Sequence, residues 1–143
     1  MKKFFAVIAI LGSAFTTSMY AQGNTPTAVL TSFQQSFDKA ENSSWSTVKG
    51  LYRVDFTIDD QKVAAFFNPA GELVATSREV SLQQIPLALK YDLKKNFDGY
   101  EVTNLFEVDN KEGVTYYASI NNEKSQLSLE STSSGDWISH KKG

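Results

Sequence analysis

The chain has 143 residues, a length that fits one ordinary domain with one hydrophobic core. Hydrophobic residues make up 41% and aromatic residues 13%, which is too apolar for a disordered chain. The formal net charge is only −2, so the sequence shows no basic surface for nucleic acid. It contains no cysteine, which excludes disulfides, zinc–thiolate sites and thiol catalysis.

Residues 1–21 have the three parts of a secretory signal peptide. Lys2 and Lys3 precede an apolar run over residues 4–11, and a small and polar stretch ends at Ala21. Because the apolar run is well short of the ~20 residues that cross a bilayer, we expect cleavage after Ala21 and no membrane anchor. No second apolar stretch of that length follows. The sequence therefore predicts a periplasmic or secreted protein that leaves the membrane after signal cleavage.

The first half of the mature chain predicts one helix and three strands. Residues 22–26 form a polar leader that we expect to be disordered, and the domain is expected over residues 27–140. An apolar stripe over residues 27–40, carried by Val29, Leu30, Phe33 and Phe37, is typical of an amphipathic helix. Residues 41–44 are expected to end this helix. Strands follow over residues 51–58, 62–67 and 72–76, separated by turn signals.

The second half repeats this order. Residues 81–96 carry another helical stripe with Pro86 in its first turn. Strands are expected over residues 100–108, 114–120 and 126–130, with a last short strand at 136–138. Alternation along the first of these strands places four apolar side chains on one face, which are Tyr100, Val102, Phe106 and Val108.

These elements predict an α+β fold of two tandem α-β-β-β repeats, over about residues 27–77 and 81–140. Their period of roughly 55 residues is too long for a solenoid repeat. Neither helix can bury its apolar stripe alone, and neither small sheet can cover its own apolar face. We therefore expect one antiparallel sheet with both helices on one face.

Aromatic and turn residues recur at characteristic places over about residues 27–139. They are Val29-x3-Phe33-x3-Phe37, Trp45, Tyr52-x-Val54-x-Phe56, Phe66-Phe67-x3-Gly71-x-Leu73, Ile85-Pro86, Gly99-Tyr100-x-Val102 and Tyr116-Tyr117. In these motifs the chain resembles the PepSY-like family of secreted bacterial proteins, whose fold is similar to that of the β-lactamase inhibitor protein (BLIP). The resemblance implies two helix-plus-sheet repeats side by side. It also implies a role in binding or restraining other exported proteins, without a known reaction.

The sequence offers no pattern for catalysis, a cofactor or a metal. His140 is the only histidine and stands near the C-terminus, where it is a poor base for a nucleophile. Asp59-Asp60 and Asp109-x2-Glu112 stand where hairpins are expected to turn, and acidic residues favour turns. Four further carboxylates, which leave a carboxylate-based sugar hydrolase open as a distant alternative, are Asp55, Glu101, Glu107 and Glu130.

The sheet face away from the helices is the candidate binding surface, because an antiparallel sheet covered on one side leaves the other side open. Alternation assigns ten residues to it: Arg53, Asp55, Thr57, Glu101, Thr103, Thr115, Tyr117, Ser119, Gln126 and Ser128. Tyr117 is the foremost candidate contact, because Tyr and Arg often anchor interfaces. One ring of the Phe66-Phe67 pair is expected to add an apolar spot.

The sequence thus favours a non-enzymatic protein-binding domain, an inhibitor or restraint of another exported or envelope protein. A carrier of a small ligand or peptide in a crevice between the two repeats is the alternative.

Overall fold

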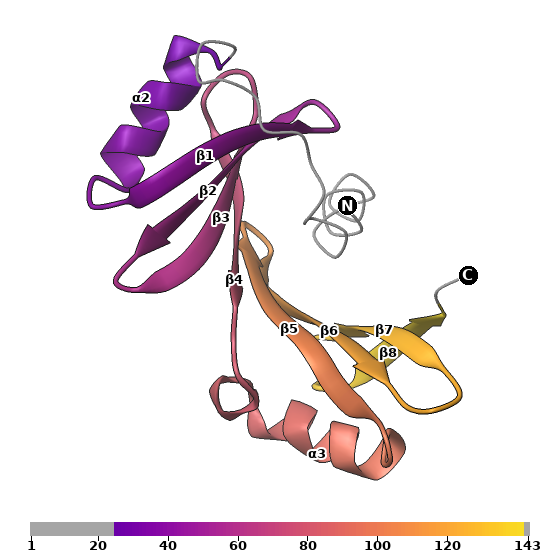
Figure 1. Ribbon diagram of the computed structural model, residues 1–143. Helices are drawn as coiled ribbons and strands as arrows, with labels where there is room; N and C mark the ends of the chain where they lie inside the picture. Colours follow the sequence, from indigo (N-terminus) through magenta and orange to yellow (C-terminus); the bar gives the residue numbers. More distant parts are fainter. Residues whose placement is uncertain (1–24, 142–143) are drawn as a thin grey trace. The chain divides into compact units, whose positions relative to one another are not determined.

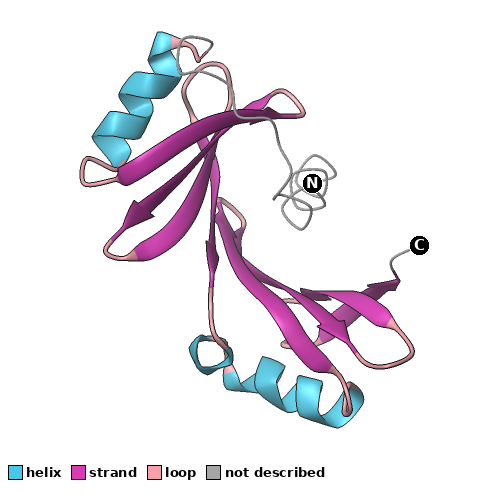
Figure 2. Ribbon diagram, in the orientation of Figure 1, coloured by secondary structure: helices cyan, strands magenta, loops and turns pink. Residues whose placement is uncertain are grey.

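The computed structural model describes residues 25–141, and the predicted signal peptide lies outside them. The chain divides into two compact units, with the boundary after Arg78. In the described residues, each unit has one α-helix followed by four strands (Figure 1, Figure 2). The strands of each unit pair antiparallel in chain order. The predicted α+β class with antiparallel strands is confirmed, with four strands per unit in place of the three in the predicted repeat.

Unit 1 is built from five elements, which are α2 (Thr27–Ser36), β1 (Glu41–Val48), β2 (Leu51–Ile58), β3 (Gln61–Phe67) and β4 (Leu73–Glu79). Strand β1 corrects the prediction that residues 41–44 form a break. The pairing of β1 with β2 shifts register between Glu41 and Ser44, and Asn42 there has a φ of 56°. Asn tolerates this conformation better than most residues, so a polar, turn-like sequence is accommodated as a bulge in a strand.

The core of unit 1 is aromatic. Phe33 of α2 packs edge-on against Trp45 of β1 and Phe56 of β2, with ring centroids 5.3 and 5.2 Å apart. The N-terminal end of α2 lies so close to the β3–β4 turn that a Cβ on Gly71 would stand 2.6 Å from the Ala28 carbonyl oxygen. Gly71 also has a φ of +88°, so only glycine fits this turn without strain.

Unit 2 is built from a 3₁₀ turn and five further elements, which are η2 (Leu82–Gln84), α3 (Leu87–Asn96), β5 (Glu101–Asn110), β6 (Gly113–Asn121), β7 (Gln126–Ser131) and β8 (Trp137–Lys141). The second helix was predicted from residue 81 but begins at Leu87. Proline disfavours helical backbone in the residue before it, and Ile85, just before Pro86, is extended with a ψ of 158°.

The core of unit 2 is mainly aliphatic. Leu89 of α3 packs with Leu105, Ile120 and Leu129 of the sheet, and with Trp137 of β8. The Trp137 indole N–H donates to the Leu89 carbonyl oxygen at 2.9 Å. Helix α3 is thus tied to β8 by packing and by a buried hydrogen bond.

A bulge in β5 corrects the predicted facing of this strand. Its pairing with β6 shifts register between Val102 and Asn104, so Leu105 enters the core opposite Ala118. Phe106 and Val108 therefore lie on the other side of the sheet from Leu105 and Val102. One inserted residue moves every later side chain of the strand to the opposite face.

The two units match at an offset of 60 residues. Pro26 and Pro86 are the N-caps of α2 and α3, and the backbone N–H groups of Phe37 and Phe97 donate to the carbonyl oxygens four residues earlier. Each first strand also has its bulge at the matching place. This offset is somewhat longer than the predicted period.

Candidate functional site

The helix-free face of each unit, meaning the side of its sheet opposite its own helix, is where the predicted contact residues must be sought. In unit 1 the register places four side chains in one row across the strands, Ser46, Arg53, Phe66 and Ala75. All four are buried, with Arg53 only 7% and Phe66 0% exposed. The expectation that Arg53 is exposed on an open face is therefore wrong, and neither ring of the Phe66-Phe67 pair forms an exposed spot, since Phe67 is also 0% exposed.

The Arg53 guanidinium is occupied within unit 1. Its Nε and Nη2 atoms donate to the Asp55 carboxylate at 3.0 and 2.8 Å, and its Cζ lies 5.5 Å from the centroid of the Phe66 ring. The Nη1 atom is buried without a hydrogen-bond partner. Asp55, whose side chain is 46% exposed, and the half-buried Thr57 remain at the edge of this surface. The arrangement fixes Arg53 in place and leaves it poorly placed to meet a partner.

The helix-free face of unit 2 is more open. Its central row runs across all four strands through directly paired residues, Phe106, Tyr117, Glu130 and Ile138. Ile138 is 49% exposed and the other three are half-buried. Beside it lies a polar row of Asn104, Ser119, Ser128 and His140, also joined by direct pairing. Aromatic and aliphatic groups thus adjoin small polar ones, as in the core and rim of many interfaces.

Five of the predicted contact residues lie on this face of β6 and β7, namely Thr115, Tyr117, Ser119, Gln126 and Ser128. The other two predicted in unit 2 stand at or beside the β5 bulge. Glu101 is exposed opposite Asn121, and the exposed Thr103 uses its hydroxyl to donate to the Ser119 carbonyl oxygen at 3.1 Å.

Tyr117 is the most unusual residue of the central row. Its hydroxyl oxygen is buried and has no hydrogen-bond partner. Burial raises the pKa of Tyr117 well above its ordinary value, and the nearby Glu130 carboxylate raises it further, whereas a polar contact with the Thr115 side chain, outside hydrogen-bond geometry, lowers it. At physiological pH Tyr117 is thus a neutral phenol whose hydroxyl is buried, so its ring is the part of the side chain available for contact.

Five residues of these two rows were not among the predicted contact residues, namely Asn104, Phe106, Glu130, Ile138 and His140. Phe106 was assigned to the core because the β5 bulge reverses the alternation. His140, which the sequence places near the C-terminus and beyond the last predicted strand, lies in β8, and its Nε2 stands 3.4 Å from Glu130 Oε1. The strand persists because Thr132 organises the serine-rich turn before it, accepting at Oγ1 from the backbone N–H groups of Ser134 and Asp136.

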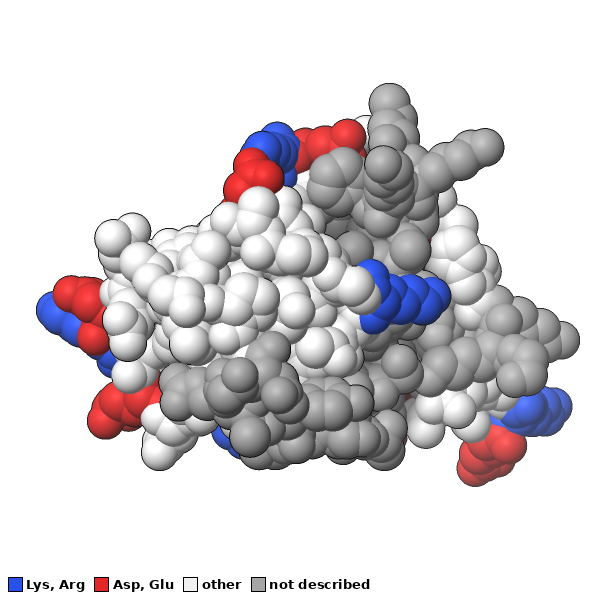
Figure 3. Space-filling model, turned by 90° about the horizontal axis from the view of Figure 1, so that it is seen from above, with Lys and Arg blue, Asp and Glu red and all other residues white. Residues whose placement is uncertain are grey.

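The acidic residues of the turns do not converge. Asp59 and Asp60 occupy the β2–β3 turn with positive φ, as the turn interpretation predicts. Within residues 25–141, no three acidic or histidine side chains come together in a group that could hold a metal ion. In the same residues no helix combines the length and apolar character needed to span a bilayer. Figure 3 shows Lys and Arg side chains next to Asp and Glu side chains at several places on the visible face.

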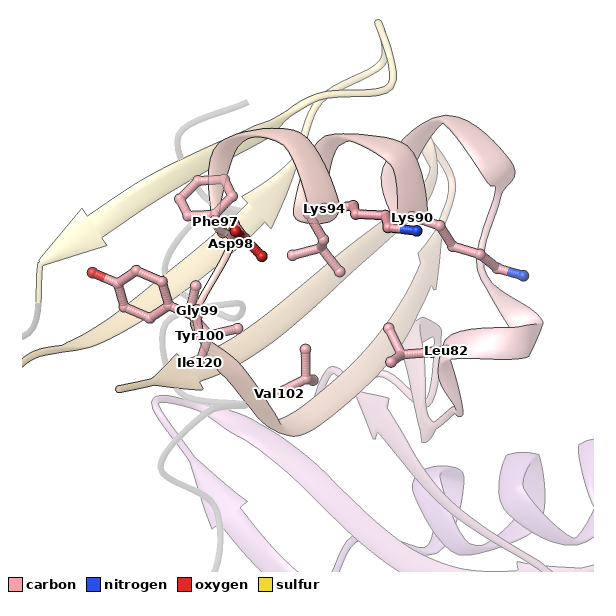
Figure 4. Close-up of a pocket in the computed structure, with 10 residues that line it drawn as sticks. Leu82, Lys90, Lys94, Phe97, Asp98, Gly99, Tyr100, Val102 and Ile120 are labelled. Carbon is pink, nitrogen blue, oxygen red and sulfur yellow. The ribbon is translucent and has the colours of Figure 1, made fainter. Parts of the chain in front are cut away.

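In the described residues, each unit has a pocket beside the C-terminal half of its helix. The pocket of unit 2, about 300 Å³, lies between α3 and the sheet (Figure 4). That of unit 1, about 420 Å³, involves α2 and the residues that follow it. The lining residues of the two pockets include six pairs at the offset of 60, which are Leu30 and Lys90, Phe33 and Leu93, Gln34 and Lys94, Phe37 and Phe97, Asp38 and Asp98, and Ala40 and Tyr100.

No protein-family model matches the sequence, and no curated protein matches it. Solved structures do match. A protein proposed to be periplasmic from Bacteroides eggerthii superimposes with a TM-score of 0.77 at 19% identity, covering 83% of this chain and 90% of that one. A DUF2874 family protein from Bacteroides ovatus gives a TM-score of 0.73 at 20% identity, covering 80% and 85%.

A BLIP-like protein from Bacteroides fragilis gives a TM-score of 0.70 at 13% identity, covering 92% of this chain and 89% of that one. Identities this low show a shared fold and no more. The fold implied by the sequence resemblance is thereby supported, whereas membership of the PepSY-like family stays a prediction. The chain has a BLIP-like α+β fold.

Proposed function

We propose that this chain is an exported, non-enzymatic protein-binding domain that contacts its partner through the helix-free face of unit 2. The observation that carries the proposal is the central row, which places the half-exposed Ile138 in line with two aromatic side chains across four strands. A large aliphatic side chain exposed at the end of a row that also holds two half-buried rings is a natural anchor for a partner.

The partner must cover more than this row. A stable interface buries about 800 Å² on each partner, supplied by some 20–30 residues. The polar row of Asn104, Ser119, Ser128 and His140 extends the surface on one side, and its hydroxyl, amide and imidazole groups offer both donors and acceptors. Glu130 is the one acidic group within the central row, so a partner that supplies a cation or a hydrogen-bond donor opposite it fits this surface best.

The finer parts of the proposal rest on the sequence. The signal-like segment over residues 1–21 supports export to the periplasm or the medium, where the partner is another exported or envelope protein. The resemblance to PepSY-like proteins supports a role in inhibiting or restraining that partner. The shared caps, bulges and pocket positions at an offset of 60 support an origin of the two units as tandem repeats.

The test compares two variants with equal exposure and different faces. Ile138 and Val114 are each 49% exposed, but Val114 precedes the core-facing Tyr116 by two residues and lies on the α3 side of β6. Wild-type chain, Ile138→Lys and Val114→Lys are used to capture proteins from the envelope and medium of the exporting cell, and binding of the recovered protein is then measured with purified components. We expect Ile138→Lys to abolish binding and Val114→Lys to preserve it. Equal binding by both variants would show that this face is not the contact surface.

A further inference from the structure

The pocket of unit 2 combines an apolar wall with two cations. Its floor includes the fully buried Ile120 of β6, and its sides include Leu93 of α3 and Val102 of β5. Lys90 and Lys94, one helical turn apart, project from the same side of α3 above Leu82 and Val102 (Figure 4). Neither lysine forms a salt bridge with a described residue. An apolar cavity with unpaired positive charge at its edge suits an apolar molecule with an anionic head.

The only acidic residue in the lining, Asp98, sits at the other end of the pocket. In Figure 4 Asp98 lies beside Phe97 and Gly99, whereas the two lysine side chains extend toward Leu82. Tyr100 at that same end is held in place, because its hydroxyl shares a 2.8 Å hydrogen bond with the Ser125 hydroxyl. An anionic head is therefore favoured near Lys90 and Lys94, with its tail along Val102, Ile120 and Leu93.

The matching pocket of unit 1 shows that these lysines are not required by the fold. At the offset of 60 residues, Lys90 corresponds to Leu30 and Lys94 to Gln34, whereas Asp98 corresponds to Asp38. The same architecture thus carries two lysines and one aspartate in unit 2, but one aspartate and no lysine in unit 1. Only the pocket of unit 2 is suited to an anion.

We infer that the α3 pocket of unit 2 binds a small apolar carboxylate with an unbranched chain. A volume of about 300 Å³ lies at the lower end of the range for ligand sites and accommodates roughly ten non-hydrogen atoms at about 30 Å³ each. A medium-chain fatty acid such as octanoate has this size and charge. The pocket lies on the α3 side of the sheet. Experiments on the pocket therefore test this inference independently of the protein-binding role proposed for the helix-free face.

The experiment titrates the exported chain with sodium octanoate and follows binding by calorimetry and by amide chemical shifts in NMR. Octylamine and 1-octanol, with the same tail but a positive or neutral head, separate the charge requirement from tail burial. We expect saturable octanoate binding that shifts the resonances of Leu93, Phe97 and Val102, and that weakens at high salt because the lysines are accessible. Octylamine is expected not to bind.

Two variants locate the charge. Lys90→Leu with Lys94→Gln installs the residues of unit 1 and is expected to weaken octanoate binding about five- to tenfold. Lys95→Gln removes one positive charge from the same helix, but Lys95 lies over the Tyr91 ring and outside the pocket, so affinity should change less than about twofold. An unchanged NMR spectrum outside α3 shows that the variants are folded.

Several results would overturn the inference. They are equal binding of octanoate and octylamine, unchanged octanoate affinity in the double variant, an equal loss in Lys95→Gln, and no saturable octanoate binding at about 10 mM.

A short peptide ending in leucine is tested with a free and with an amidated C-terminus. Binding of the free-acid peptide without any binding of octanoate would assign the pocket to a protein terminus and overturn the small-molecule proposal.

Discussion

The two units share an order of elements but differ in how they bury the second side of their sheets. In unit 1, β3 carries Ala64 and Phe66 on its helix-free side and Ala65 and Phe67 on its core side, and all four are buried. In unit 2, the matching side of β7 carries Ser128 and Glu130, and both are only half-buried. A strand that is apolar on both faces is expected to be buried on both. A strand whose apolar and polar residues alternate is expected to have one solvent-exposed face. The binding surface is therefore better sought in unit 2.

The helices differ in the same way. The exposed positions of α2 are uncharged, namely Thr27, Ala28, Thr31, Gln34, Gln35 and Ser36. Those of α3 include Lys94, Lys95 and the strongly exposed Leu87 and Tyr91. Equal caps and equal lengths thus hold helices whose surfaces have different chemistry, and both sites proposed above lie in unit 2.

The largest expected effect tests the difference between the cores. Phe56→Ala removes a buried ring that contacts both Phe33 and Phe37, so it should lower the free energy of unfolding by about 3–5 kcal/mol. Leu129→Ala in the aliphatic core of unit 2 should cost about 2–5 kcal/mol. Urea denaturation measures both. A loss of less than about 1 kcal/mol for Phe56→Ala would show that this core repacks around the cavity.

A second prediction tests the difference between the helix-free faces. Arg53→Ala should destabilise the protein by about 2–3 kcal/mol, because it removes buried packing on Phe66 and two hydrogen bonds to Asp55. The sequence-based placement of Arg53 on an open face would instead predict little loss of stability. Ser119→Ala on the face of unit 2 should stay within about 0.5 kcal/mol of wild type. Equal, small effects in thermal denaturation would contradict the contrast between the faces.

A third, smaller effect tests how α3 is held. The Asp92 carboxylate accepts from the Trp137 backbone N–H at 2.9 Å and also from the Asn96 side chain. Asp92→Ala leaves a buried N–H without a partner and should cost about 1–2 kcal/mol. Ser32 stands at the matching position of α2, and Ser32→Ala should be nearly neutral. Hydrogen exchange at the Trp137 amide should accelerate in Asp92→Ala only, and protection equal to wild type would contradict the assigned role.

Much of this architecture was predictable from local patterns, and the errors have specific physical causes. The stripes of Val29 with Phe33 and of Leu89 with Leu93 placed both helices, and alternation placed β2 and β6. The two bulges were not predictable, because the extra residue is specified by pairing with the neighbouring strand and not by its own sequence. Phe106 was assigned to the wrong face for this reason.

The candidate site could be predicted only in part from the sequence patterns. Tyr117, Ser119 and Ser128 follow from alternation, but the burial of Arg53 depends on its neighbours Phe66 and Asp55 across and along the strands. A signal was present in the doubly apolar run over residues 62–67, which indicates a strand buried on both sides. The pocket lysines could not be recognised from the sequence, because their role depends on the β5 and β6 residues below them.

The finest contrast concerns Tyr117, whose raised pKa makes stability depend on pH. The unfolded tyrosine loses its proton near its ordinary pKa of about 10, whereas the folded one keeps it, so the native state binds more protons above that pH. The contribution of Tyr117 is thus fully present below about pH 10 and is lost as pH rises further toward the folded pKa.

Tyr117→Phe should make the fall in the free energy of unfolding between about pH 9 and 11 shallower. Near neutral pH the same variant should be as stable as wild type or slightly more stable, because it removes an unpaired buried hydroxyl. Tyr91→Phe, which removes a hydroxyl from a side chain 67% exposed on α3, serves as the control variant. Identical profiles for Tyr117→Phe and wild type would mean that the Tyr117 hydroxyl is solvated in solution, and the helix-free face of unit 2 would then be wetter than its burial indicates.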